Sequence, residues 1–117
     1  LEAGINAVKP QNTVGDIGHE IEKIVNAGGG YLADGLTGHG VGEQVHEEPA
    51  IYNFGSPGEG VVLVPGMVIA IEPMVSMTTS QVEQLDDDSF ATLDGSKSAH
   101  FEHTILVTQN GKEVLTL

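Results

Sequence analysis

Apolar residues recur at helical spacing in one stretch of the chain, between residues 13 and 27. They stand at Val14, Ile17, Ile21, Ile24 and Val25. Because residues three and four positions apart lie on the same face of a helix, this spacing predicts an amphipathic helix. No other stretch has a helical pattern of this quality.

Thr13 is placed to begin this helix, and three glycines are placed to end it. The Thr13 hydroxyl can accept a hydrogen bond from the first turn, and Asp16 lies three residues further on, as in a capping box. Gly28-Gly29-Gly30 follows the last apolar position, and glycine readily adopts the left-handed conformation common at helix C-termini. The opening residues 1–5 resemble the end of another helix, so we expect the chain to begin inside a larger protein.

Beyond the glycines, the pattern changes to short β-branched segments separated by turn residues. We expect strands near Tyr31–Ala33, Val61–Val64, Met67–Glu72, His100–Thr108 and Glu113–Thr116. Asn110-Gly111 predicts a type I′ hairpin turn, because both residues tolerate positive φ, whereas Val82–Phe90 is expected to be a polar loop. The predicted fold class is therefore α+β, with one clear helix followed by a mainly antiparallel sheet.

The chain is strongly acidic. It has 17 acidic and 4 basic residues among 117, for a formal net charge of −13. Nucleic-acid binding depends mainly on lysine and arginine, so we expect no nucleic-acid partner. A metal ion or a cationic substrate suits this charge better, although most acidic residues are expected simply to solvate the surface. With 39% hydrophobic residues, the chain is expected to form one globular domain at most.

The chain contains no cysteine. Disulfides, thiolate metal sites and cysteine nucleophiles are thus excluded, and any metal must be held by histidine, aspartate or glutamate. The sequence has neither an apolar stretch long enough to span a bilayer nor an opening signal peptide. We therefore expect no membrane partner and a cytoplasmic location.

Polar groups suited to catalysis concentrate in four short segments, at residues 38–42, 46–49, 71–74 and 101–104. Glu72 ends an apolar run and Glu102 precedes another, and a carboxylate beside buried residues is costly without a partner. A metal ion is one natural partner for two carboxylates and a histidine. The alternative is that both carboxylates cap strand ends through backbone N–H groups and that the histidines are structural.

Strand geometry narrows the candidates, because side chains two residues apart lie on the same face of a strand. Glu102 would share a face with His100, whereas His103 would point the other way and is the weaker candidate for a ligand. Glu72 would share a face with the small Ala70, which leaves space beside the carboxylate for an ion or a substrate.

Four motifs support one another in their order and separation: Gly38-His39-Gly40-Val41-Gly42, His46-Glu47-Glu48-Pro49, Ile71-Glu72-Pro73-Met74 and Phe101-Glu102-His103-Thr104. Together they resemble the methionine aminopeptidases of the bacterial type (type I), and the similarity covers essentially the whole chain. The resemblance implies half of a pita-bread fold. Residues 1–117 would form the C-terminal half of a metallo-aminopeptidase catalytic domain whose N-terminal half is absent.

The resemblance also implies residue roles. His39, Glu72 and Glu102 would be metal ligands in a site for two divalent ions, such as Co, Mn, Fe or Zn. Glu72 would also serve as general base toward a metal-activated water and then pass the proton to the leaving amine. His46 would be catalytic without binding metal, by hydrogen-bonding the substrate. The implied function is metal-dependent removal of N-terminal methionine from nascent proteins and peptides.

Part of the family's machinery has no counterpart in this sequence. The other metal ligands of the family are two aspartates, which together with another catalytic histidine lie on segments preceding those matched here. Nothing in residues 1–38 matches them, and Asp16 and Asp34 belong by motif to other elements. The chain alone is therefore expected to be inactive or nearly so, with the missing N-terminal half of the fold as its partner.

Three residues expected to bind substrate, as walls of the methionine pocket, depart from the family pattern. Val45 stands where an aromatic residue is common, His100 where glutamine is usual, and Phe90 where tryptophan is frequent. Such changes can shift preference without loss of the reaction, since one methylene in an apolar pocket contributes about 1–3 kcal/mol. Two alternatives therefore stay open: a related exopeptidase with a different N-terminal preference, and a non-catalytic binding module that retains half of the fold.

Overall fold

The computed structural model describes residues 1–116. Its elements in chain order are α1 (Glu2–Ala7), α2 (Val14–Ala27), β1 (Tyr31–Leu32), β2 (Gly38–Gly40), β3 (Glu47–Ile51), β4 (Val68–Ile71), β5 (Met74–Ser76), β6 (Val82–Gln84), β7 (Phe90–Thr92), β8 (Ser98–His100), β9 (His103–Thr108) and β10 (Gly111–Val114). The predicted α+β class is confirmed. Neither helix is long and apolar enough to cross a membrane.

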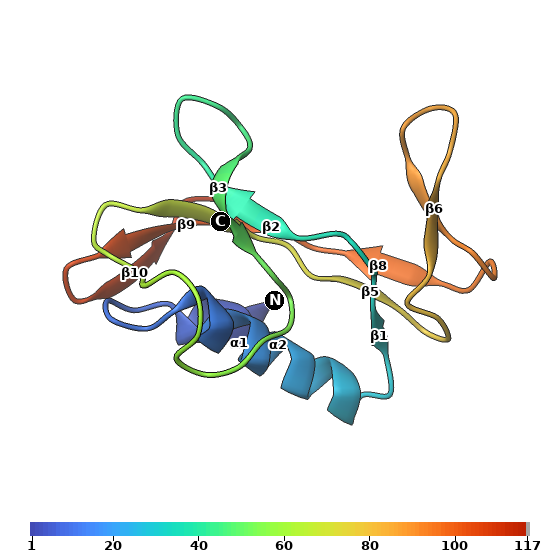
Figure 1. Ribbon diagram of the computed structural model, residues 1–117, viewed down its shortest axis with the longest axis horizontal. Coiled ribbons are helices and arrows are strands. Elements are labelled where there is room, and N and C mark those ends of the chain that lie inside the picture. Colours follow the sequence, from blue (N-terminus) through green and yellow to red (C-terminus); the bar gives the residue numbers. More distant parts are fainter. Residues whose placement is uncertain (117) are drawn as a thin grey trace.

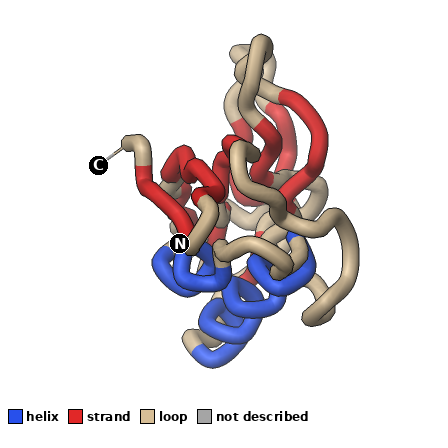
Figure 2. Tube along the Cα trace, turned by 90° about the vertical axis from the view of Figure 1, so that its left-hand side faces the viewer, coloured by secondary structure: helices blue, strands red, loops and turns tan. Residues whose placement is uncertain are grey.

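The helices and the main sheet form two layers (Figure 1). The main sheet has five antiparallel strands in the order β10-β9-β4-β2-β3, and α1 and α2 lie on one side of it. Seen from the side, the helices (blue) form a layer below the strands (red) (Figure 2). A three-stranded sheet, β1-β5-β8, continues away from the main sheet toward the projecting β6–β7 hairpin.

The hydrophobic core lies between α2 and two neighbouring strands of the main sheet, β4 and β9. It includes the fully or almost fully buried Ile17, Ile21, Ile69, Ile71, Ile105 and Val107. Complete burial of one such side chain contributes about 1.5–3 kcal/mol. Because alternate side chains of a strand point to opposite faces, the odd-numbered positions of β4 and β9 pack on the helices. The even-numbered positions, such as Ala70, face the opposite side.

The predicted helix is confirmed as α2, together with both of its end signals. The Asp16 carboxylate accepts from the Thr13 backbone N–H at 2.7 Å, and the Thr13 hydroxyl accepts from the Asp16 N–H at 3.3 Å. The Thr13 N–H bond is the main reason why the pKa of Asp16 lies below its ordinary value. At the other end, Gly29 has a left-handed φ of 71°. The expected helix at the start of the chain is also present, as α1.

The predicted strand at Val61–Val64 is wrong. The segment forms a single bridge, between Thr13 and Val62, and further backbone hydrogen bonds join it to residues 11–14 around the start of α2. Leu63 N donates to Asn12 O at 2.7 Å, and Val14 N donates to Val61 O at 3.0 Å. These apolar residues therefore secure the chain across the start of α2 instead of adding a strand to a sheet.

The predicted continuous strand at His100–Thr108 is interrupted at residues 101–102. β8 pairs with β5, whereas β9 pairs with β4 and β10. The interruption lets the chain pass from the three-stranded sheet to the five-stranded one. It also removes Glu102 from regular strand geometry, so simple alternation does not describe its environment.

Two turns differ from their predictions. Val82–Phe90 is not a loop throughout, because residues 82–84 pair with residues 90–92, and the loop is confined to residues 85–89 at the tip of this hairpin. The last hairpin is present, but Gly111 pairs with Thr108, so Gln109 and Asn110 form the turn. Neither of these two residues has a positive φ, so the predicted type I′ turn is wrong.

Candidate metal centre

His39 lies on β2 between two glycines that allow neighbouring backbones to come close. The register of β2 with β4 places His39 directly opposite Ala70. Since directly opposed residues point to the same face of a sheet, His39 projects from the face that the helices leave free. A Cβ on Gly38 would overlap the Ala70 carbonyl oxygen, so this close pairing requires glycine.

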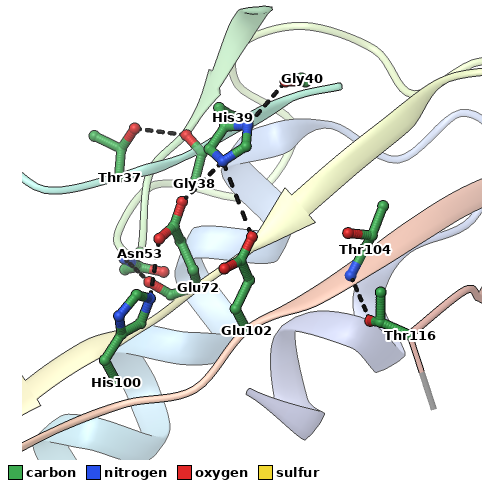
Figure 3. A network of polar contacts seen from close by, with 10 residues as sticks. All are labelled: Thr37, Gly38, His39, Gly40, Asn53, Glu72, His100, Glu102, Thr104 and Thr116. Atoms are coloured by element: carbon green, nitrogen blue, oxygen red, sulfur yellow. Dashed lines mark hydrogen bonds and ion pairs between the residues drawn. The ribbon is translucent and has the colours of Figure 1, made fainter. Parts of the chain in front are cut away.

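Glu72 and Glu102 reach the same region from two strand ends. Glu72 follows β4, two residues after Ala70, and Glu102 lies in the break between β8 and β9. His39 Nε2 lies 3.2 Å from Glu72 Oε1 and 4.0 Å from Glu102 Oε1 (Figure 3). The structure thus brings together three residues singled out from the sequence, with ligand atoms all within 4.8 Å of one another.

The hydrogen bond made by His39 Nδ1 determines which ring nitrogen faces the carboxylates. Nδ1 lies 2.9 Å from the Gly40 carbonyl oxygen, which can only accept, so Nδ1 carries a proton. Nε2 is then the ring nitrogen directed at the Glu72 and Glu102 carboxylates. One imidazole nitrogen and two carboxylates with their ligand atoms close together form a donor set that suits a divalent metal ion. The residues present therefore fit such an ion.

The burial of the three side chains differs. The His39 and Glu72 side chains are 13% and 11% exposed, whereas that of Glu102 is 42% exposed. Within residues 1–116, neither carboxylate accepts a hydrogen bond from a backbone N–H. The alternative that these glutamates cap strand ends therefore has no support in the described part of the chain.

His46 lies beside the cluster and not within it. Its ring packs edge-on against that of His39, with centroids 4.3 Å apart and an angle of 64° between the planes. Both histidines and Glu72 line a cavity of about 540 Å³. The expected contact of His46 with a substrate stays a prediction, for which its place at the cavity wall is suitable.

The chain matches a known peptidase family over most of its length. Residues 1–109 match the model of metallopeptidase family M24. The chain belongs to this family. Metallopeptidases act through bound divalent metal, and His39, Glu72 and Glu102 are the group of described residues placed to hold one.

Several curated relatives in family M24 are methionine aminopeptidases. The one from Clostridium perfringens is 46% identical over 115 residues, which cover 97% of this chain and 46% of the relative. Methionine aminopeptidase A from Synechocystis is 46% identical over 118 residues, which cover 100% of this chain and 47% of the relative. The chain thus spans about half the length of the curated relatives it matches.

Solved structures of the family show the same fold. The methionine aminopeptidase from Thermotoga maritima matches with a TM-score of 0.94 and 49% identity, over 99% of this chain and 47% of that one. The prolidase from Pyrococcus furiosus matches with a TM-score of 0.72 and 28% identity, over 99% and 29%. The expected half of a pita-bread fold is confirmed, as is the resemblance to methionine aminopeptidases.

Of the three residues expected to form walls of the methionine pocket, two lie at the cavity and one does not. Phe90 and His100 line the cavity that contains His39 and Glu72. Val45 does not belong to its lining, and its side chain is 71% exposed. A substrate in the cavity would therefore meet Phe90 and His100, whereas a role for Val45 has no geometric support.

Asn53 was missed by sequence reasoning. Its side chain is 3% exposed, and its Nδ2 donates to the Glu72 carbonyl oxygen at 3.3 Å. Asn53 thus fixes the backbone of a cluster residue. No local pattern could have indicated this contact, because it joins residues far apart in the sequence.

The two aspartates of residues 1–38, assigned from the sequence to other elements, do lie away from the cluster. Asp16 caps α2, and Asp34 accepts a hydrogen bond from the Ser80 hydroxyl at 2.8 Å. Neither belongs to the cluster of ligand atoms. Within residues 1–116, the cluster therefore offers a metal ion three protein ligands, which are His39, Glu72 and Glu102.

Proposed function

We propose that the polypeptide to which this chain belongs removes N-terminal methionine from peptides and nascent chains by metal-dependent hydrolysis. The convergence of His39, Glu72 and Glu102 carries this proposal, because it assembles a metal-binding donor set beside a cavity. The relatives that match over nearly the whole chain are methionine aminopeptidases. A cytoplasmic location, where nascent chains emerge, is part of the same proposal.

His39, Glu72 and Glu102 would hold part of a centre of two divalent ions, such as Co, Mn, Fe or Zn. Three protein ligands are few for two ions, so the remaining ligands would come from a partner half of the fold outside this chain. When bound, such ions lower the pKa of a coordinated water and polarise a scissile carbonyl group. The Glu72 carboxylate, which lines the cavity, would also suit the positively charged amino terminus of a substrate.

Glu72 would move the proton in this reaction. Its carboxylate is nearly buried and lines the cavity, so it can accept a proton from the attacking water and deliver it to the leaving amine. His46, on the same cavity wall, would donate a hydrogen bond to the substrate carbonyl oxygen as negative charge develops there. The free amino terminus would be recognised by the carboxylates, which would restrict cleavage to the first residue.

The decisive experiment combines metal binding with hydrolysis. We expect Mn²⁺ or Co²⁺ to bind to the chain, and hydrolysis of a methionyl peptide to require a polypeptide extended to the relatives' length. In that extended polypeptide, Glu72→Gln should abolish hydrolysis while the fold persists by circular dichroism. Glu113→Gln, which removes an exposed carboxylate from β10, outside the cavity lining, should have no effect. Absence of metal binding in both polypeptides would refute the proposal and favour a non-catalytic binding module.

The methionine preference needs a separate test. Phe90 and His100 line the cavity. By the family resemblance both are expected to depart from the usual residues of a methionine pocket, so a related exopeptidase with another preference is the competing function. A library of peptides that differ only in the first residue would measure kcat/KM for each side chain. We expect methionine to be preferred, and a higher value for another residue would favour the competing function.

A further inference from the structure

The two carboxylate oxygens of Glu72 face different histidines. Oε1 lies 3.2 Å from His39 Nε2, within the proposed metal centre, whereas Oε2 lies 3.0 Å from His100 Nε2 (Figure 3). An ionised carboxylate can only accept hydrogen bonds, so the His100 Nε2–H group donates this hydrogen bond to Oε2. One oxygen is thus directed to the metal centre while the other is held by His100.

The sheet fixes the position of His100. β8 pairs with β5 in a register that places His100 opposite Met74, two residues after Glu72. The chain between β4 and β5 therefore carries Glu72 alongside the end of β8. The His100 side chain is 50% exposed and the Glu72 side chain is 11% exposed, so a half-exposed histidine contacts a nearly buried carboxylate.

We propose that His100 is a positioning residue that orients the Glu72 carboxylate for metal binding, beyond any contact it makes as a cavity wall. The inference rests on the proposed metal centre. Hydrogen bonds from neighbouring groups fix the orientation of ligand side chains, and their loss commonly lowers metal affinity about 10- to 100-fold. A carboxylate free to rotate must lose that freedom when the metal binds, which weakens binding.

Two other roles for His100 predict different results. As a wall of the substrate cavity, it would change KM for peptides and leave metal affinity unaltered. If His100 were an additional metal ligand, a residue without an imidazole could not replace it. As a positioning residue, it would be replaceable by glutamine, because the glutamine side-chain amide donates a hydrogen bond from a place close to that of His Nε2.

The first experiment measures Mn²⁺ affinity of the chain by electron paramagnetic resonance for wild type, His100→Gln and His100→Leu. We expect His100→Leu to weaken binding at least about 10-fold and His100→Gln to change it less than about 3-fold. His103→Leu is the matched control, because His103 is a nearby histidine whose Nδ1 contacts the Thr116 hydroxyl at 2.9 Å instead of the cluster. Since His100 is half exposed, its variants should fold, which circular dichroism can verify.

Two results would overturn the inference. Unchanged affinity in His100→Leu would leave at most the cavity-wall role. Equal loss in both variants would indicate that His100 is a metal ligand. A wild-type chain that binds no metal would instead count against the proposed metal centre, and the next experiment then decides the role of His100 without metal.

The second experiment records the imidazole ¹⁵N signals of the metal-free chain by long-range ¹H–¹⁵N correlation. Glu72→Gln replaces the acceptor of His100 and should shift the His100 Nε2 signal, whereas Glu102→Gln should shift it much less. This pattern would support the positioning contact independently of hydrolysis and of metal binding. A His100 signal that responds equally to both substitutions, or to neither, would overturn it.

Discussion

His39 Nε2 lies 3.2 Å from Glu72 Oε1 because β2 and β4 pair in one particular register. That register sets His39 opposite Ala70, and Glu72 follows two positions later on the same face. A shift of one residue would turn His39 toward the helices and separate the two groups. The metal-binding capacity of the chain therefore depends on how precisely this strand pair is specified.

The two neighbouring histidines should differ in their effect on metal binding. His39→Ala removes the only nitrogen of the three-ligand cluster, so we expect Co²⁺ or Mn²⁺ affinity to fall at least about 10-fold. His46→Ala removes a ring that packs against His39 but contributes no ligand atom to the cluster, so affinity should change much less. Isothermal titration calorimetry on both variants would measure the difference.

A different order of effects would change the assignment of ligands. If His46→Ala reduced metal affinity as much as His39→Ala, then His46 would have to be counted among the ligands. Both variants should unfold at nearly the same temperature as wild type in the absence of metal, which separates ligand loss from structural damage.

Gly38 should be far less tolerant of substitution than another strand glycine. A Cβ at Gly38 would overlap the Ala70 carbonyl oxygen, so Gly38→Ala must push β2 away from β4. We expect a loss of about 1–3 kcal/mol in the free energy of unfolding, as for other overpacked sites, with weaker metal binding. Urea denaturation followed by circular dichroism measures the change.

Gly111 provides the matched control for Gly38. It lies on β10, where an added Cβ would meet no atom within 4 Å, and its φ lies outside the left-handed region. Gly111→Ala should therefore change the free energy of unfolding by less than about 0.5 kcal/mol. Comparable destabilisation by both substitutions would show that the close approach of β2 and β4 is unimportant for stability.

Local patterns predicted those parts of the fold that local contacts determine. The spacing from Val14 to Val25 and the Thr13–Asp16 pair predicted α2 with its capping box, because both depend on residues three and four apart. The strands β2 and β3 were missed. They are short, glycine- and glutamate-rich segments that become strands only through pairing with β4 and with each other.

The candidate site was predictable to a similar extent. Two carboxylates beside apolar runs indicated Glu72 and Glu102, and the family resemblance separated His39 from His46. The contact between His100 and Glu72 could not be foreseen, because it depends on the pairing of β8 with β5 and on the interruption before β9. The alternation argument treats residues 100–108 as one strand, whereas pairing with β5 and with β4 divides them between β8 and β9.

An exposed apolar groove should make the chain associate with itself at high salt. Ile24 of α2 and Phe101, which are 58% and 68% exposed, line a groove of about 590 Å³. Exposed apolar surface of this kind favours association, but the net charge of −13 opposes it at low ionic strength. Light scattering should therefore show an apparent mass that rises with sodium chloride concentration.

A substitution within the groove tests this expectation. Ile24→Glu places a charge in the groove and should restore the mass of a monomer. Leu93→Glu adds the same charge at a residue that is 55% exposed and lies outside the groove, and it should suppress association less. A wild-type chain that stays monomeric at all salt concentrations would contradict the prediction.

The Asp16 carboxylate should stabilise the chain in a pH-dependent way. Hydrogen bonds, chiefly from the Thr13 backbone N–H, hold the pKa of Asp16 below its ordinary value of 3.8 in the folded chain. Above that value Asp16 is ionised whether the chain is folded or unfolded, and its stabilisation is complete. As the pH falls further, the unfolded chain takes up a proton first, so the stabilisation declines until the folded chain is protonated too.

Asp16→Asn should therefore cost about 0.3–1 kcal/mol at pH 7, the usual contribution of a negative charge at a helix N-terminus. The difference from wild type should shrink as the pH is lowered from 5 to below the folded pKa. Asp86→Asn removes the same charge from the turn between β6 and β7, away from any helix, and serves as control. Urea unfolding at a series of pH values measures both variants, and a constant difference between Asp16→Asn and wild type would mean that the charge of Asp16 does not stabilise α2.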